Sequence, residues 1–219
     1  MKITFSIPAY NEEHRIARCL ESVQKEIVRA GCDAEIIVVN NASTDRTREI
    51  ASSLADVRVV DESRKGLTRA RQVGYMASVG ELIANVDADT MLPPGWVSKV
   101  LREFGGNKDL VALSGPFILY DLPMWQRILA HLYYSTIPAI NVFTQYVLRS
   151  GAILQGGNFV LRRSALEKVG GFDTSIEFYG EDTDIARRIS KVGKVKWTMR
   201  FPMYASGRRF KKEGLVRVT

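Results

Sequence analysis

Two aspartates separated by one residue, Asp87 and Asp89, directly follow the apolar segment Leu82–Val86. Carboxylates at the open end of a buried strand offer the hard oxygen ligands that Mg²⁺ and Mn²⁺ prefer, and a metal held there could bridge a diphosphate. The same acids could instead be solvated loop residues that cap a following helix. The triplet alone leaves a metal site and a plain loop both open.

Two further polar segments follow apolar segments in the same way. Tyr10 and Glu12 follow Ile3–Ile7, and they offer a ring on which a base could stack and an acceptor for base or ribose donors. Asn41 follows Glu35–Val39 and could pair with a base edge. A proline turn with helix-opening acids, and an asparagine turn, would explain the same residues without a ligand.

A third pair of acids, Glu181 and Asp182, begins an expected helix directly after Gly180. A carboxylate there could act as a general base if the fold brings it opposite the metal site. First-turn acids are also favoured by the helix dipole, so the sequence physics alone does not decide between the two interpretations.

The elements that must position these side chains alternate along the first ninety residues. Apolar runs predict strands at Ile3–Ile7, Glu35–Val39, Val57–Val60 and Leu82–Val86. Apolar spacing of three to four predicts helices at Glu12–Ala30, Arg46–Leu54 and Leu67–Ser78, with Gly31 closing the first and Ser43 capping the second. This alternation predicts an α/β fold with a doubly wound, mostly parallel sheet and helices on both faces. The loops that carry the polar residues should then meet at one edge of the sheet.

The second half of the chain is less regular. We expect a strand at Leu110–Leu119 broken by Gly115 and Pro116, a strand and short helix from Phe159 to Val169, a helix at Asp182–Lys191 and a strand at Val195–Met199. Ile128–Leu148 has no charged side chain and lies between Arg127 and Arg149. Its length would suit a membrane span, but it contains polar residues, and Pro138 should break a helix near its middle. We therefore expect a helical pair that packs on the domain or touches a bilayer surface.

Composition limits the possible partners. The chain has 219 residues, a net charge of +7 and two cysteines, which we interpret as reduced thiols of a single-domain cytoplasmic protein without a secretion signal. A positive charge is compatible with nucleic acid, an anionic membrane or a phosphorylated substrate. No recognition helix or aromatic-and-basic sheet motif is present, so we expect no nucleic-acid partner.

The ordered motifs PAYNEE, VNNASTD, GLTRARQVG, DADT, GGNFVLRRSALEKVGGFD and GED resemble those of the family 2 glycosyltransferases of the GT-A fold, from Lys2 to about Trp197. The resemblance implies transfer of a sugar from a nucleotide-diphosphate donor to a hydroxyl of a glycan or lipid-linked acceptor, with Mn²⁺ or Mg²⁺ as cofactor. It implies an inverting enzyme of cell-envelope glycan, polysaccharide or glycolipid synthesis, peripheral at the cytoplasmic membrane. It divides the chain into a donor half (1–90), an acceptor half (91–200) and a basic tail (201–219).

The resemblance also assigns roles by position. The residues expected to bind the nucleotide are Pro8, Ala9, Tyr10, Glu12, Asn41, Arg71, Asp87, Ala88 and Asp89. Asp87 and Asp89 are expected to hold the metal, and Asp182 to be the general base with Glu181 beside it. Gly156, Gly157 and Asn158 are expected to border the acceptor side.

Three features qualify this assignment. The family usually has aspartate where this chain has Asn41, so a preference for uracil is open. No QxxRW motif is present, which favours addition of one or a few sugars over polymer synthesis. The basic tail, Arg208 to Lys212, could close over the diphosphate or could be a solvated end. The alternatives are a nucleotidyltransferase, whose glycine-rich first loop is missing here, and a binding module without turnover.

Overall fold

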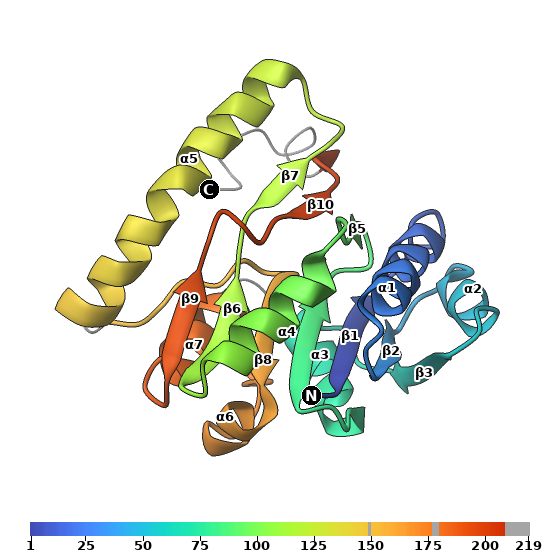
Figure 1. Cartoon of the computed structure of the whole chain (residues 1–219). Helices are drawn as coiled ribbons and strands as arrows, with labels where there is room; N and C mark the ends of the chain where they lie inside the picture. Colours follow the sequence, from blue (N-terminus) through green and yellow to red (C-terminus); the bar gives the residue numbers. More distant parts are fainter. Residues whose placement is uncertain (149, 177–179, 209–219) are drawn as a thin grey trace.

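A seven-stranded sheet with the order β3-β2-β1-β4-β8-β6-β9 forms the centre of the computed structural model, which describes residues 1–148, 150–176 and 180–208 (Figure 1). Its strands are β1 (Ile3–Ala9), β2 (Ala34–Asn41), β3 (Val57–Glu62), β4 (Leu82–Val86), β6 (Leu110–Ser114), β8 (Asn158–Arg162) and β9 (Lys194–Trp197). All neighbouring pairs are parallel except those that β8 makes with β4 and β6. The predicted mostly parallel α/β sheet is confirmed.

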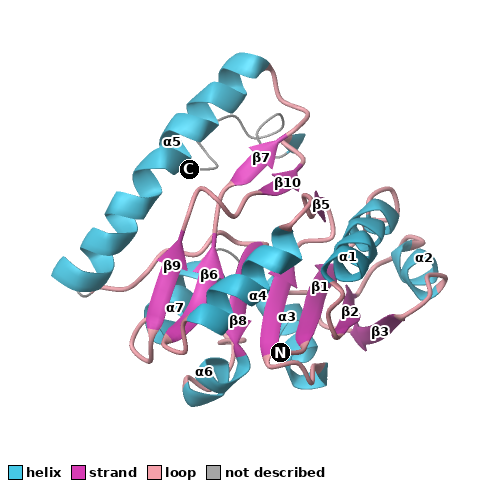
Figure 2. Cartoon of the chain, in the orientation of Figure 1, coloured by secondary structure: helices cyan, strands magenta, loops and turns pink. Residues whose placement is uncertain are grey.

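Helices cover both faces of this sheet (Figure 2). They are α1 (Ile16–Ala30), α2 (Thr47–Ser52), α3 (Leu67–Ala77), α4 (Trp96–Gly106), α6 (Arg163–Lys168) and α7 (Glu181–Ile189). Side chains of β1 and β4 such as Phe5 and Ala84 pack with α1 and α4, whereas Ile83 packs with α3, α6 and α7. Because successive strand residues point to opposite faces, the apolar runs of β2 and β4 contribute to cores on both faces, whereas the apolar residues of β1 lie in the core under α1 and α4.

The end of α1 follows the expected local signal, whereas the start of α2 does not. Gly31 closes α1 with a φ of 58°, the left-handed conformation that glycine adopts at low cost. Ser43 does not cap α2 as expected, because its hydroxyl lies against the Asn11 amide and the Ala9 carbonyl. Asp45 accepts the Thr47 N–H at 2.9 Å instead. The expected cap was wrong because a contact between the loops after β1 and β2 takes the serine hydroxyl.

A second, three-stranded sheet lies beyond the carboxyl ends of β4 and β6 (Figure 1). It consists of β5 (Thr90–Met91), β10 (Met203–Ala205) and β7 (Phe117–Leu119), in that order. The expected break at Gly115 and Pro116 separates β6 from β7. β10 brings residues near the end of the described chain back beside the segment that follows Asp87 and Asp89.

Helix α5 (Met124–Val142) runs along the outside of the smaller sheet and continues into η1 (Phe143–Val147), a short π-helical segment. The expected pair of helices was wrong, because α5 continues through Pro138. Contacts of Tyr134 and Ile137 with Trp197 hold the turn before the proline, and in the turn after it Asn141 Oδ1 accepts the Ile153 N–H at 2.8 Å. Within the described residues, no helix is both long and apolar enough to cross a membrane.

Candidate functional site

Four polar segments that are distant in sequence meet at the carboxyl edge of the main sheet. The loops after β1, β2 and β4 meet there because these strands are parallel neighbours. Strand β8 is antiparallel to β4, and Val86 pairs with Asn158, so the segment just before β8 ends at the same edge. This topology brings Gly156 and Gly157 to the aspartates that follow β4.

The guanidinium of Arg71 lies at the centre of this arrangement. Its Nη1 donates to Glu181 Oε1 at 2.9 Å, and its Nη2 lies 3.4 Å from Asp87 Oδ1. The Arg71 side chain is fully buried. Arg71 belongs to α3, and the packing of α3 on β1 and β2 fixes the position of its guanidinium. Arg71 therefore connects the loop after β4 to the first turn of α7.

The Asp182 carboxylate lies beside Gly156. A Cβ added at Gly156 would lie 3.3 Å from Asp182 Oδ2 and 3.9 Å from Arg71 Nη2. The other Asp182 oxygen, Oδ1, accepts the Thr183 backbone N–H at 2.8 Å. The structure thus brings the expected base, Asp182, to the Arg71–Asp87 pair, as the sequence pattern predicts for a shared site.

Gly157 leaves the space that the Asp87 carboxylate fills. A Cβ there would lie 2.1 Å from Asp87 Oδ2, closer than any real contact allows, and its φ is +74°. Asn158, by contrast, points into the core, where its amide bonds to Trp96 Nε1, Gly115 O and Phe201 O. Asn158 is therefore a structural residue that holds β8, β6 and the chain before β10 together.

Asp89 and Glu12 share one cationic partner, Arg208. Arg208 Nη2 lies 3.1 Å from Asp89 Oδ2, and Arg208 also makes a bidentate contact with the Glu12 carboxylate. Burial raises the pKa of Asp89, the charge of Arg208 lowers it, and the charge of Glu12 raises it. The edge of the site therefore concentrates negative charge and already binds one cationic group.

The same negative field reaches the buried thiol of Cys19, whose Sγ lies 3.6 Å from the Asp87 carbonyl. Burial raises the pKa of this thiol, and the charges of Asp89 and Asp87 raise it further. Its environment makes Cys19 a packing residue of α1 rather than a nucleophile.

The donor set suits a divalent cation that a ligand helps to hold. No group of three or more His, Cys, Asp or Glu side chains forms a ready-made cage in residues 1–148, 150–176 and 180–208. Asp89 is nevertheless a desolvated carboxylate, and the cationic guanidinium of Arg208 lies against it. Gly157, which has no side chain, makes room for the carboxylate of Asp87. Two carboxylates with further oxygens from a diphosphate form a usual Mg²⁺ or Mn²⁺ site.

The residues expected to bind a base lie farther along the same edge. The Tyr10 ring is 40% exposed, and Lys65 Nζ lies 3.9 Å from its centroid. Pro8 and Ala9 are buried at the end of β1, opposite Val39 and Asn40. Lys65 covers one face of the ring on which a planar base could stack, so Lys65 belongs to this part of the site.

Asn41 organises the loop that carries Lys65. Its Nδ2 donates to the carbonyls of Arg64, at 2.8 Å, and Glu62, at 3.3 Å, while its Oδ1 accepts the Gly66 N–H at 2.8 Å. In this arrangement the amide shapes the loop rather than facing a base. Sequence reasoning missed this role, because Asn41 and its partners are more than twenty residues apart.

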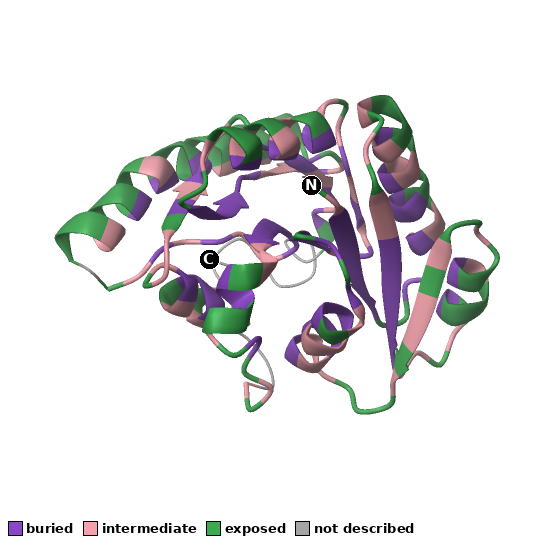
Figure 3. Cartoon of the chain, turned by 60° about the horizontal axis from the view of Figure 1, so that its bottom comes forward, coloured by how far each residue is buried: buried purple, intermediate pink, exposed green. Residues whose placement is uncertain are grey.

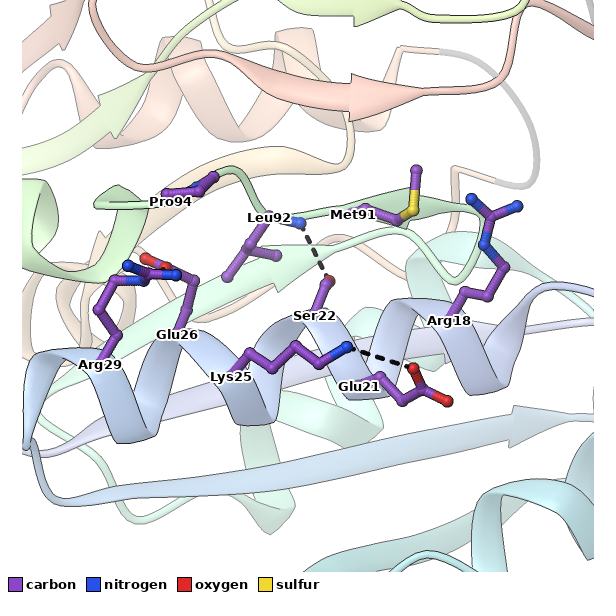
Figure 4. Close-up of a pocket in the computed structure, with 9 residues that line it drawn as sticks. All are labelled: Arg18, Glu21, Ser22, Lys25, Glu26, Arg29, Met91, Leu92 and Pro94. Atoms are coloured by element: carbon purple, nitrogen blue, oxygen red, sulfur yellow. Dashed lines mark hydrogen bonds and ion pairs between the residues drawn. The ribbon is translucent and has the colours of Figure 1, made fainter.

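A cavity in the described residues lies away from this edge of the sheet. A cavity of about 300 Å³ runs between α1 and the segment after β5, where Ser22 accepts the Leu92 N–H at 3.0 Å (Figure 4). Its charged lining residues all lie on α1, where Lys25 pairs with Glu21 and Arg29 pairs with Glu26, and Arg18 leaves one net positive charge. None of the residues expected to bind substrate lines this cavity.

Two protein-family models match parts of the chain. Residues 4–170 match the description "Glycosyl transferase family 2", and residues 142–211 match "N-terminal domain of galactosyltransferase". A protein of Bacillus subtilis (strain 168) named "Probable glycosyltransferase YdaM" is 28% identical over 210 residues, which are 88% of this chain and 47% of that protein. Chondroitin synthase of Pasteurella multocida (strain Pm70) is 30% identical over 209 residues, 89% of this chain and 19% of the synthase. The chain thus spans less than half the length of these relatives.

Structure comparison identifies the fold. S. aureus TarS 1–349 superimposes with a TM-score of 0.72 at 18% identity, covering 98% of this chain and 63% of TarS. The mannosyltransferase PcManGT from Pyrobaculum calidifontis, in complex with GDP-Man and Mn²⁺, has a TM-score of 0.72 at 21% identity, covering 93% of this chain and 56% of PcManGT. A complex of TarS 1–349 with UDP-GlcNAc also matches, with a TM-score of 0.68. The expected fold is confirmed.

Proposed function

We propose that this chain, which belongs to glycosyl transferase family 2, transfers a sugar from a nucleotide-diphosphate donor to an acceptor hydroxyl with inversion at the anomeric carbon. The family membership predicted from the six motifs is confirmed by the match over residues 4–170. The observation that carries the proposal is the convergence of Asp87, Arg71 and Asp182 around Gly156 and Gly157.

Asp182 supplies the general base in this proposal. It lies at the start of α7, and its Oδ2 is directed toward the space beside Gly156. A carboxylate in hydrogen-bond reach of the acceptor hydroxyl removes its proton as the oxygen attacks the anomeric carbon. The bond to the donor diphosphate breaks on the opposite face of the sugar, so a single displacement inverts the configuration.

Asp89 and Asp87 would hold Mn²⁺ or Mg²⁺ together with diphosphate oxygens of the donor. When bound, this metal would supply positive charge that stabilises the leaving diphosphate. Arg208 makes the corresponding charge contact with Asp89 and Glu12 in the structure. PcManGT is described in complex with Mn²⁺, which supports a metal for this chain.

The nucleotide would lie along the edge formed by Pro8, Ala9, Tyr10 and Glu12, with its base over the Tyr10 ring and beside Lys65. Relatives are described with UDP-GlcNAc and with GDP-Man, so the fold accepts donors with different bases. Ala88, which lies between the two aspartates, packs into the core and would hold the two carboxylates in place at the donor site.

The acceptor is a glycan or lipid-linked hydroxyl in this proposal, and the chain acts on it at the cytoplasmic side of a membrane. In this proposal residues 1–90 form the donor side, because they include Tyr10 and Asp89. Residues 91–200 form the acceptor side, because they include Asp182. The basic tail from 209 onward lies outside the described residues. Arg208, at its start, already reaches the donor side.

A thermal-shift panel with UDP-, GDP-, dTDP- and CMP-sugars, each with and without Mn²⁺, tests the donor site. One donor class should stabilise the wild-type chain in a metal-dependent way, by about 2.7 kcal/mol at one hundred times its Kd. Asp89→Ala should abolish this shift, whereas Asp109→Asn, at an exposed aspartate before β6, should keep it. A shift that survives Asp89→Ala would refute the metal site, and no shift with any donor would favour a binding module without this ligand.

Replacement of Gly157 by alanine tests the space that Asp87 needs. Gly157→Ala should cost about 1–2 kcal/mol from left-handed backbone and also displace Asp87, which would weaken metal-dependent donor binding. Gly170→Ala is the matched control, because Gly170 has a φ of +79° but open space around its Cβ position. Urea unfolding should give the smaller loss of stability for Gly170→Ala, whose added Cβ meets no neighbouring atom, and donor titration should show weaker binding for Gly157→Ala. Equal donor affinities in the two variants would contradict the proposed role of Gly157.

A further inference from the structure

Helix α5 and segment η1 expose a continuous set of large apolar side chains (Figure 3). The exposed members are Met124, Trp125, Ile128, Leu129, Leu132, Tyr133, Ile140, Val142, Phe143, Tyr146, Val147 and Leu148. We call this set the α5 face. Single exposed apolar residues are common on proteins, but a contiguous set of this size marks a binding surface.

The helix is apolar on both sides, and only one side contacts the domain. Tyr134 and Ile137 pack against Trp197, and Ala130 packs against the smaller sheet. Trp125, Leu129 and Leu132, which recur at spacings of three to four residues, lie on the other side and are exposed. A helix that only packs on its own domain needs apolar residues on its inner side and usually has a polar outer side. The apolar residues on the outer side of α5 therefore require a separate partner.

The charges around the α5 face are positive. No aspartate or glutamate occurs from residue 122 to residue 166, whereas Arg127 and His131 lie within α5. A cavity of about 400 Å³ just after η1 is lined by Ser150, Gly151, Arg187, Ser190 and Lys191. Its two cationic side chains are exposed, and no acid lines it. An apolar face with cations beside it and no acids complements an anionic lipid surface.

The composition of the α5 face also matches the membrane interface. Trp125, Tyr133 and Tyr146 combine an apolar ring with a polar group, the property that concentrates tryptophan and tyrosine at the headgroup level. No described helix could span a bilayer, and α5 has one side attached to the domain, so it would lie parallel to the surface.

We propose that the α5 face inserts into the headgroup–acyl boundary of a membrane containing anionic lipids, with Arg187 and Lys191 contacting lipid phosphates. This surface would keep the acceptor half at the bilayer, where a lipid-linked hydroxyl is presented. The link to the acceptor rests on the proposed function, whereas the membrane contact itself depends only on the α5 face.

Tryptophan fluorescence tests the proposal on the unmodified chain. The chain has three tryptophans, of which Trp96 and Trp197 are 3% and 5% exposed and Trp125 is 58% exposed. Vesicles of phosphatidylcholine with 30 mol% phosphatidylglycerol, about a third anionic lipid, should shift the emission to the blue. Lipids brominated on their acyl chains should quench it. Absence of both effects at low salt would overturn the proposal.

Vesicle co-sedimentation of matched variants identifies the surface. Trp125→Ser/Leu132→Ser/Tyr146→Ser should bind these vesicles at least about tenfold more weakly, because three interfacial side chains are lost. Val28→Ser/Met76→Ser/Val79→Ser removes three exposed apolar side chains from other elements and should bind like wild type. Arg187→Ser/Lys191→Ser should weaken binding mainly at low salt. Equal binding by all three variants would overturn the assignment.

Two further readouts separate this proposal from its competitors. Sedimentation velocity without lipid would reveal a dimer that the α5-face variant abolishes, and that result would assign the face to a second copy and overturn the membrane proposal. The α5-face variant should retain metal-dependent donor stabilisation. If this variant loses vesicle binding but keeps donor binding, the membrane contact and the donor site are independent. The membrane proposal and the proposed function can then fail separately.

Discussion

Asp182→Asn should lower kcat about 10²- to 10⁴-fold while leaving the Kd of the donor nearly unchanged. The asparagine keeps the size of the side chain and its hydrogen bond from the Thr183 N–H, but it cannot accept the acceptor's proton. The rate is measured as release of nucleoside diphosphate from the donor found in the thermal-shift panel, in the presence of an added alcohol acceptor. Donor affinity is measured by titration calorimetry.

Asp184→Asn is the control for the Asp182 experiment. Asp184 lies in the same turn of α7, but its carboxylate pairs with Arg188, at 2.6 Å, rather than with the site. Its replacement should leave kcat within about threefold of wild type and cost no more than the ~1 kcal/mol of a partly exposed ion pair. A kcat for Asp182→Asn close to that of Asp184→Asn would remove Asp182 from the mechanism.

Arg71→Met should destabilise the fold by about 3–5 kcal/mol, a large part of a typical domain's ~5–15 kcal/mol. The methionine would fill part of the same space, but Glu181 and Asp87 would lose the buried cation that neutralises them. Donor binding should weaken as well, because the two carboxylates would separate. Urea unfolding gives the change in stability.

A second variant separates charge from packing at Arg71. In Arg71→Met/Glu181→Gln, the side chain that loses its 2.9 Å ion pair with Arg71 becomes neutral, so part of the lost stability should return. The non-additive part of this double-mutant cycle should reach about 0.5–3 kcal/mol, as for residues in direct contact. Strict additivity would show that Arg71 acts through packing alone.

The elements of the first half could be predicted because their signals are local. The spacing of Ile16, Leu20 and Val23 and the glycine at 31 define α1, and short apolar runs define β1, β2 and β4. The order of the parallel strands then places Tyr10, Asn41 and Asp87 at one edge. The division of the chain into donor, acceptor and tail segments remains a prediction.

The parts that could not be predicted depend on contacts between distant residues. The two-residue strand β5 and the three-residue strand β10 are too short for a periodic signal, and they exist because they pair with each other. Arg208 lies 196 positions from Glu12, so no spacing pattern could connect them. The continuity of α5 through Pro138 depends on tertiary packing that overrides the usual effect of proline.

The antiparallel strand β8 has a consequence for the order in which the chain can assemble. The edge of β4 that faces away from β1 is paired by β8, and Ala84 is opposite Val160. Those two residues are 76 positions apart, an interval that a ribosome translates in roughly 4–15 s. During that interval the first four strands can form their parallel pairs, but the backbone groups along the outer side of β4 have no native strand beside them. The sheet that holds Asp87 is therefore closed in its middle, when β8 joins β4 to the β6 strand that is already synthesised, and β9 pairs with β6 only afterwards.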